Sequence, residues 1–167
     1  VALVVWNTAG CADTATLTID VYYSPTSSFS YSGNCARNPI LFTDLSTGNS
    51  GNLSSWYWDF DDGFTSNLQN PTHTFAGAGN YNIVLTVANS NGCNDDTTIS
   101  IIIDALPLPD FEDSTSCANR YTFFTDLSDT TGGSSIINWL WNFGDDSTSS
   151  LQNPVHFYDT AGTYQVK

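Results

Sequence analysis

Clusters of aspartate are the groups in this chain whose spacing comes closest to a chemical site. Asp59, Asp61 and Asp62 crowd one short segment, and Asp145 and Asp146 crowd another. Close carboxylates repel one another unless a cation neutralises them, and Ca²⁺ takes oxygen ligands from such loops. The same side chains also cap turns by accepting hydrogen bonds from backbone N–H groups. Two interpretations therefore stand side by side, a calcium site and a set of turn caps.

The chain has two histidines, His73 and His156. They occupy equivalent places in a repeated motif, one repeat apart, so we do not expect them to share a metal ion. We predict that a ring nitrogen of each bonds to nearby backbone and that both belong to the structural core. No Ser-His-Asp order, zinc-ligand spacing or phosphate-binding loop stands out. The chain is therefore predicted not to be an enzyme, and calcium is its one candidate cofactor.

Internal repetition organises the whole chain. Phe42-Thr43-Asp44-Leu45-Ser46 recurs 82 residues later as Phe124-Thr125-Asp126-Leu127-Ser128, and Leu68-Gln69-Asn70-Pro71 recurs 83 residues later as Leu151-Gln152-Asn153-Pro154. One residue is therefore inserted between Ser128 and Trp141. We predict three parts: residues 1–24 are the closing strands of one repeat, residues 25–106 are a complete repeat, and residues 107–167 are a third repeat that stops before its last strands.

The elements that position these residues have the chemistry of β-strands. Residues 40–46, 80–89 and 97–103 are rich in β-branched and aromatic side chains, with partial alternation. Clusters of Asn, Gly, Ser and Asp lie between them, and Asn91-Gly92 is a strong hairpin signal. No stretch has a convincing amphipathic helix. The sequence predicts an all-β chain of tandem immunoglobulin-like sandwiches, arranged end to end.

The repeated motifs resemble the PKD (polycystic kidney disease) domain. The first copy reads Trp58-Asp59-Phe60-Asp61-Asp62-Gly63, then Asn70-Pro71-Thr72-His73, then Gly79-Asn80-Tyr81. The second copy resembles the family equally, from Trp141 to Tyr164. The copies depart from the family at Asp61 and Asp146, where glycine is usual. The resemblance implies a sandwich with Trp58 and Trp141 in the core and Tyr81 and Tyr164 as tyrosine corners.

The four cysteines, Cys11, Cys35, Cys93 and Cys117, are disulfide candidates. Four cysteines allow three pairings, and a secreted setting favours oxidation. In a stack of repeats, the cysteine after the first strand of one unit faces the last-turn cysteine of the next. We predict disulfides that span the junctions, with most partners outside residues 1–167, whereas a Cys35–Cys93 bridge would contradict this arrangement.

The charge balance restricts the partners. Three Lys and Arg stand against 17 Asp and Glu, a net charge of −14, which repels nucleic acid and anionic membranes. No apolar run is long enough to span a bilayer. We expect an extracellular or cell-surface location, with neighbouring repeats, other copies of the protein or surface glycans as partners.

Two functions remain open. The first is a stalk, filament or adhesin segment, similar to repeats of large Bacteroidota surface proteins. The alternative is a substrate-binding accessory module of a secreted hydrolase.

Overall fold

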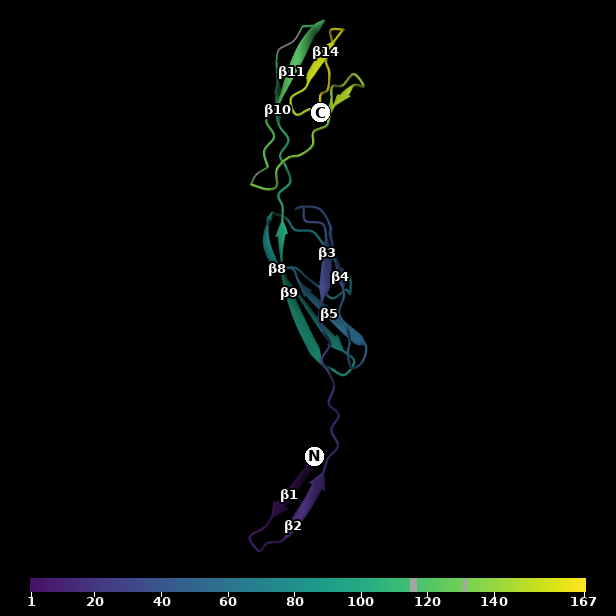
Figure 1. Cartoon of the computed structure of the whole chain (residues 1–167), viewed down its shortest axis with the longest axis vertical. Coiled ribbons are helices and arrows are strands. Elements are labelled where there is room, and N and C mark those ends of the chain that lie inside the picture. Colours follow the sequence, from purple (N-terminus) through teal and green to yellow (C-terminus); the bar gives the residue numbers. More distant parts are fainter. Residues whose placement is uncertain (115–116, 131) are drawn as a thin grey trace. The chain divides into compact units, whose positions relative to one another are not determined.

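A computed structural model describes residues 1–114, 117–130 and 132–167 of the chain (Figure 1). Its regular elements are all β-strands, as the sequence predicts. They are β1 (Ala2–Trp6), β2 (Ala12–Thr16), β3 (Phe29–Ser32), β4 (Ile40–Asp44), β5 (Leu53–Asp59), β6 (Thr65–Ser66), β7 (Thr72–His73), β8 (Gly79–Asn89), β9 (Asn94–Ile103), β10 (Phe111–Asp113), β11 (Arg120–Asp126), β12 (Trp141–Asn142), β13 (Thr148–Ser149) and β14 (Val155–Tyr158). Among the described residues, no helix could cross a membrane.

The sheets repeat between the two copies. In the first copy, β3, β4 and β7 form one sheet, and β6, β5, β8 and β9 form another. In the second copy, β10, β11 and β14 match the first of these sheets, and β12 and β13 pair as β5 and β6 do. The strands β1 and β2 form a separate antiparallel hairpin. The prediction of immunoglobulin-like sandwiches is confirmed by this arrangement.

The chain is divided into two compact units. One contains Val1–Tyr31, Phe42–Pro71 and Asn82–Ile99, and the other contains Ser32–Leu41, Thr72–Tyr81 and Ser100–Lys167. The chain passes from one unit to the other within β3, β4, β8 and β9. The bounds predicted for the three repeats remain a prediction.

Alternation along the strands creates the cores. Every second residue from Ile83 to Asn89 in β8 is buried, because successive side chains of a strand point to opposite faces of the sheet. The Asn91-Gly92 pair lies in the turn that joins β8 to β9, where Gly92 has a φ of 83°. The hairpin predicted at these two residues is therefore confirmed.

An aromatic cluster recurs in the two copies with nearly the same geometry. The ring of Trp58 lies 5.1 Å from that of Phe29 and 5.7 Å from that of Phe42. The matching distances around Trp141, to Phe111 and Phe124, are 5.2 and 5.6 Å. Burial of one such ring stabilises a fold by roughly 1.5–3 kcal/mol, so these clusters are a major source of stability in both units.

Candidate functional site

The first aspartate cluster closes a turn at the end of β5. The Asp59 carboxylate accepts a hydrogen bond from the backbone N–H of Asp61 at 3.0 Å, and that of Asp62 accepts one from Phe64 at 3.1 Å. Asp61 has a φ of 62°, and its carboxylate accepts a bond from the N–H of Asn82 at 2.8 Å. These contacts are turn caps. Asp61 therefore has a left-handed backbone conformation at a position where the PKD domain, which the sequence resembles, usually has glycine.

The second copy builds the same turn with different residues. The Asn142 side chain takes the place of Asp59 and accepts a bond from the N–H of Gly144 at 2.9 Å. Gly144 has a φ of 82°, and a β-carbon placed there would lie 2.7 Å from the backbone nitrogen of Gln165. Asp146 has a φ of 69° where the first copy has Gly63. The two departures from the family pattern thus keep a left-handed backbone.

A polar cluster covers the turn in the second copy. Nε2 of His156 lies 2.7 Å from Oδ2 of Asp145, and the Ser147 hydroxyl donates to the other carboxylate oxygen at 2.5 Å. Hydrogen bonding from Ser147 and then from His156 lowers the pKa of Asp145 from 3.8 to about 2. The imidazole bonds to a side chain, whereas the sequence suggested a backbone partner, because the turn brings the Asp145 carboxylate within reach of the ring.

The order of contacts within this cluster is unlike that of a nucleophilic triad. The Ser147 hydroxyl bonds the carboxylate and lies 3.4 Å from Nε2 of His156, whereas a catalytic histidine stands between the two. The ring of His156 is also stacked on Phe143, at 4.2 Å between centroids. In the first copy, His73 packs edge-on against Phe75 at 4.7 Å. The contacts of this cluster hold a turn in place over the core.

The predicted core tryptophans and tyrosines make matching contacts in both copies. Trp58 is fully buried, and its indole N–H donates to the carbonyl of Leu68 at 2.9 Å. The indole N–H of Trp141 does the same to Leu151 at 2.8 Å. The tyrosine hydroxyls bond to backbone four residues upstream, Tyr81 to Gly77 and Tyr164 to Thr160. This is the geometry of a tyrosine corner.

The cysteines and aspartates do not form a covalent or metal centre in the part of the chain that the structure describes. No disulfide joins Cys11, Cys35 or Cys93, and Cys117 is exposed. Within the same residues, no group of three or more His, Cys, Asp or Glu side chains is placed to hold a metal ion. Junction-spanning disulfides and calcium binding both remain predictions.

In each copy, one aspartate accepts hydrogen bonds from two distant side chains, an arrangement here called an aspartate hub. Sequence reasoning missed both hubs. Oδ2 of Asp44 accepts the indole N–H of Trp56 at 2.8 Å and the amide of Gln69 at 3.0 Å. Oδ2 of Asp126 accepts the matching groups of Trp139 and Gln152 at 2.8 and 3.1 Å. Each hub therefore joins β4 or β11 to two segments that are distant in sequence.

The hub carboxyls are held in the ionised form. Burial alone would raise the pKa of Asp44, but hydrogen bonds from Ser46, Gln69 and Trp56 outweigh it, so the pKa is lowered. In the second copy, hydrogen bonding led by Ser128 lowers the pKa of Asp126 from 3.8 to about 2. The repeated Asp44 and Asp126 motifs were visible in the sequence, but their partners could not be paired without the fold.

An exposed aromatic patch, here called the β11–β14 patch, was also missed. Tyr121 faces Phe157 across the strand pair, and Phe123 faces Val155. These four side chains are 43–66% exposed, and the rings of Tyr121 and Phe157 lie 5.5 Å apart. The alternate residues of β11 point inward, where Thr122 is buried. The alternation of apolar side chains along the segment 120–126 was the sequence signal that could have revealed the β11–β14 patch.

The matching surface of the first copy is less aromatic. Pro39 and Leu41 stand where the second copy has Tyr121 and Phe123, and Thr72 and Thr74 stand where it has Val155 and Phe157. The two copies therefore share their cores and turns but differ on this outer face.

The PKD domain family matches residues 29–103 and 104–167. This chain belongs to that family. A microbial collagenase of Vibrio alginolyticus is 39% identical over 74 residues, which are 44% of this chain and 9% of that protein. The pre-pro-metalloprotease PrtV of Vibrio cholerae is 35% identical over 71 residues, 41% of this chain and 8% of that protein. This PKD chain thus matches less than a tenth of the length of either relative.

A solved PKD structure is also similar. The PKD1 domain of Vibrio anguillarum Epp is 24% identical and covers 52% of this chain and 100% of its own, with a TM-score of 0.49. The relatives named here come from Vibrio, and two of them carry the names of proteases. The narrower resemblance to Bacteroidota surface proteins remains a prediction.

Proposed function

We propose that this PKD chain is a non-catalytic accessory module of a secreted hydrolase and holds a polypeptide substrate against the β11–β14 patch. The patch is the observation that carries the proposal. Tyr121, Phe123, Val155 and Phe157 are large apolar side chains brought together on a solvent-facing surface. Such contiguous exposed patches mark interaction sites, and tyrosine and other aromatic side chains are enriched where partners bind.

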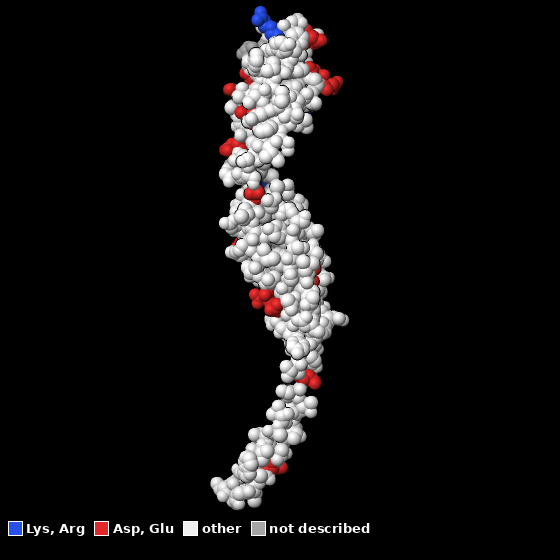
Figure 2. Space-filling model, in the orientation of Figure 1, with Lys and Arg blue, Asp and Glu red and all other residues white. Residues whose placement is uncertain are grey.

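The chemistry of the patch favours a neutral or basic polymer. The net charge of −14 disfavours anionic partners such as nucleic acid or acidic polysaccharides, and Figure 2 shows acidic side chains at intervals along the face that it displays. Two relatives carry the names collagenase and metalloprotease, which favours a polypeptide over a sugar polymer. Because collagen is an extracellular polymer, we also propose an extracellular location for this module.

A retention assay on insoluble polymers tests the proposal. The chain would be incubated with fibrillar collagen and, separately, with chitin, and the bound fraction measured against concentration. Tyr121→Ser combined with Phe157→Ser should weaken retention on collagen at least tenfold. The matched control is Leu41→Ser, which changes an exposed residue at the position equivalent to Phe123 and should leave retention unchanged.

The outcomes separate the alternatives. Retention on chitin alone would overturn the polypeptide substrate in favour of a polysaccharide. Equal losses of collagen retention in the patch variant and in the Leu41 control would show that the β11–β14 patch does not hold the substrate. Retention that neither variant changes would show the same.

A second candidate function is a spacer in a surface stalk, filament or adhesin. It is favoured by hydrogen bonds between the repeats and their linkers. The side chain of Asn89 donates to the carbonyl of Tyr23 at 3.1 Å, and Ser134 donates to the carboxylate of Asp104 at 3.1 Å. Such contacts restrict motion at a junction. The sequence that flanks these residues decides between the candidates: an adjoining catalytic domain supports the accessory module, and many more repeats support the spacer.

A further inference from the structure

The strand β14 has one edge without a neighbouring strand. It is the last strand in the order β10-β11-β14, so no strand of the described residues lies beside its other edge. The first copy has the same arrangement, because β7 ends the order β3-β4-β7 while the later strands β8 and β9 join the other sheet. The free edge is therefore a feature of the repeat that its later strands do not cover.

The backbone of β14 presents hydrogen-bonding groups to this edge. The N–H of Phe124 donates to the carbonyl of Pro154 at 3.0 Å, which fixes the phase of the ladder between β11 and β14. Hydrogen-bonded and non-bonded pairs alternate in an antiparallel ladder, so the backbone of His156 bonds to β11. Val155 and Phe157 therefore direct their N–H and C=O groups to the free edge, and each offers one donor and one acceptor.

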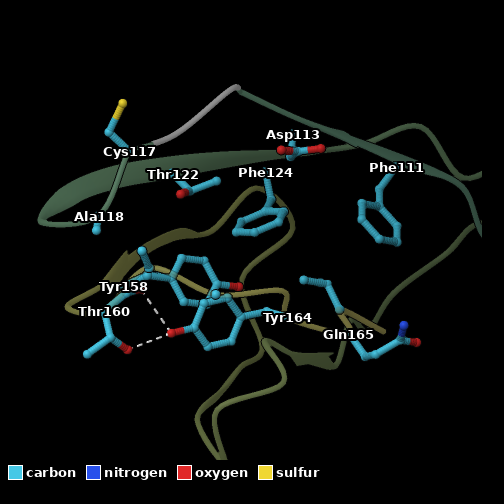
Figure 3. A pocket seen from close by; sticks show the side chains of 13 residues that line it. Phe111, Asp113, Cys117, Ala118, Thr122, Phe124, Tyr158, Thr160, Tyr164 and Gln165 are labelled. Atoms are coloured by element: carbon cyan, nitrogen blue, oxygen red, sulfur yellow. Dashed lines mark hydrogen bonds between the residues drawn. The ribbon is translucent and has the colours of Figure 1, made fainter.

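The two faces of the strand differ in chemistry at this edge. Val155 and Phe157 lie on the outer face and carry the β11–β14 patch to the end of the sheet. Figure 3 shows the inner side, to which Tyr158 points. His156 is on the same inner face, with Nε2 2.7 Å from Oδ2 of Asp145. The pKa of Asp145 is lowered to about 2, so its carboxylate is ionised at neutral pH.

We infer that the edge of β14 binds a polypeptide as an added strand, with apolar side chains at alternate positions and a basic side chain between them. In this mode of recognition, main-chain hydrogen bonds supply affinity and contacts with alternate side chains supply specificity. The inference rests on the proposed function in taking the partner to be a polypeptide. It adds the conformation and the side-chain pattern of the bound segment.

The register of the added strand follows from the free groups of β14. The residues that pair with Val155 and Phe157 place their side chains on the outer face, beside the β11–β14 patch. The residue between them lies opposite His156, where cross-strand β-carbons are about 4.5–5.5 Å apart, and its side chain faces Asp145. A lysine or arginine at this position gains a charge-assisted contact with the carboxylate, whereas an acidic side chain is repelled.

Charge favours such a partner over a second copy of this chain. Two copies that each carry a net charge of −14 repel one another. The strand β14 also has no Lys or Arg to place beside Asp145 of another copy. A segment in which apolar and basic residues alternate matches both faces of the edge.

Fluorescence anisotropy with a labelled peptide of alternating valine and lysine tests the main-chain contact. N-methylation of the valines should weaken binding at least tenfold, because it removes the N–H groups that donate to the carbonyls of Val155 and Phe157. N-methylation of the lysines is the matched control, because those N–H groups face away from β14, and it should leave the affinity nearly unchanged. Equal losses for the two methylated peptides would overturn the inference.

Variants of the chain test the same contact from the other side. Val155→Pro removes an edge donor at the first residue of β14, where proline is tolerated, and should weaken binding of the valine–lysine peptide several-fold. The matched control is Thr72→Pro, which changes the first residue of β7 and also follows a proline; it should leave binding unchanged. Circular dichroism checks that both variants keep their fold.

The charge contact has a test of its own. The chain should prefer the valine–lysine peptide to one of alternating valine and glutamate, and Asp145→Asn should reduce this preference. Asp62→Asn makes the same change in net charge at the equivalent position of the first copy, so it should leave the preference intact. Equal reductions in the two variants would show that net charge, and not Asp145, selects the basic peptide.

Amide hydrogen exchange locates the added strand without any substitution. Saturating valine–lysine peptide should slow exchange at the N–H of Phe157 and leave that of Thr74, the equivalent residue of the first copy, unchanged. Unchanged exchange at Phe157 would overturn the inference. So would a mean mass in sedimentation velocity that rises with concentration in the absence of peptide and is abolished by Val155→Pro, because a second copy would then occupy the edge.

The inference and the proposed function fail separately. Collagen retention that depends on Tyr121 and Phe157, without peptide binding at the edge, would leave the proposed function standing and overturn the added strand. Peptide binding that is sensitive to N-methylation of the valines, without collagen retention, would do the reverse.

Discussion

Replacing Asn89 with alanine should destabilise the unit that contains it, because this side chain connects three backbone segments. Asn89 is the last residue of β8 and is 2% exposed. Its amide nitrogen donates to the carbonyls of Tyr23, Gly48 and Ser50 at 3.1, 3.2 and 3.2 Å. Tyr23 belongs to the linker that precedes the first complete copy. The side chain therefore ties that linker to a loop and to the end of β8.

Asn7 provides a matched control for this substitution. Its side-chain oxygen accepts bonds from the N–H groups two and four residues later, both at 3.0 Å. The oxygen of Asn89 accepts the two equivalent bonds, both at 3.1 Å. Asn7 is exposed, so its replacement removes only the turn bonds. The difference between the two alanine variants isolates the donated bonds of Asn89.

The expected loss of unfolding free energy in Asn89→Ala follows from those donated bonds. An amide group has two protons, so the three carbonyls amount to about two full hydrogen bonds, and each contributes roughly 1 kcal/mol net. Adding the turn bonds, Asn89→Ala should cost about 2–3 kcal/mol, whereas Asn7→Ala should cost less than about 1 kcal/mol because water replaces its exposed bonds. Urea unfolding followed by tryptophan fluorescence measures both values.

Amide hydrogen exchange gives a local readout of the same tie. The N–H of Tyr23 donates to the Ser50 hydroxyl at 3.1 Å, and its exchange should accelerate in Asn89→Ala but not in Asn7→Ala. The donated bonds of Asn89 do not stabilise the fold as described if the two variants unfold within about 0.5 kcal/mol of each other, a difference typical of a surface substitution, or if exchange at Tyr23 is the same in both.

Two further predictions concern the second copy. Stability should be nearly constant above about pH 5 and fall as the pH falls from about 4 toward 2, because the Asp126 carboxyl has a pKa lowered from 3.8 to about 2 and the unfolded state binds more protons in that window. Asp126→Asn should flatten this part of the profile of unfolding free energy against pH, and parallel profiles would contradict the assignment. Gly144→Ala should be more destabilising than Gly63→Ala by about 1–2 kcal/mol, because both have a positive φ but only the first new β-carbon would meet backbone, 2.7 Å from Gln165. Thermal unfolding compares the two, and equal losses would show that backbone conformation alone sets the cost.

The fold could be predicted from the sequence because its signals are local. The alternation in residues 80–89 and the Asn91-Gly92 pair act over a few residues, and both were found where expected. The Asp44 hub could not be predicted in the same way. The side chains that donate to its carboxylate, Trp56 and Gln69, lie 12 and 25 residues away, and only the packing of strands brings them to one carboxylate.

The candidate sites were harder to predict because the same residue types serve two purposes. Clustered aspartates suit calcium ligation and also turn capping, and spacing alone does not separate the two. The contacts of Asp59, Asp61 and Asp62 with backbone N–H groups are those of caps. The outer face of β11 was overlooked for a similar reason. Tyr121 and Phe123 are of residue types that usually lie in a core, and only the fold shows that they are on the exposed face of their strand.

The two copies act as internal controls for one another. Some contacts recur in both copies with the same geometry. Trp58 and Trp141, for example, donate to backbone carbonyls at 2.9 and 2.8 Å. Such contacts are required by the sandwich itself and carry no information about a partner. Differences at equivalent exposed positions have no such structural cause. Leu41 against Phe123 is such a difference, since either side chain satisfies the outer face of its strand. Specific binding by this chain should therefore depend on the second copy, while the first copy keeps the fold and the spacing.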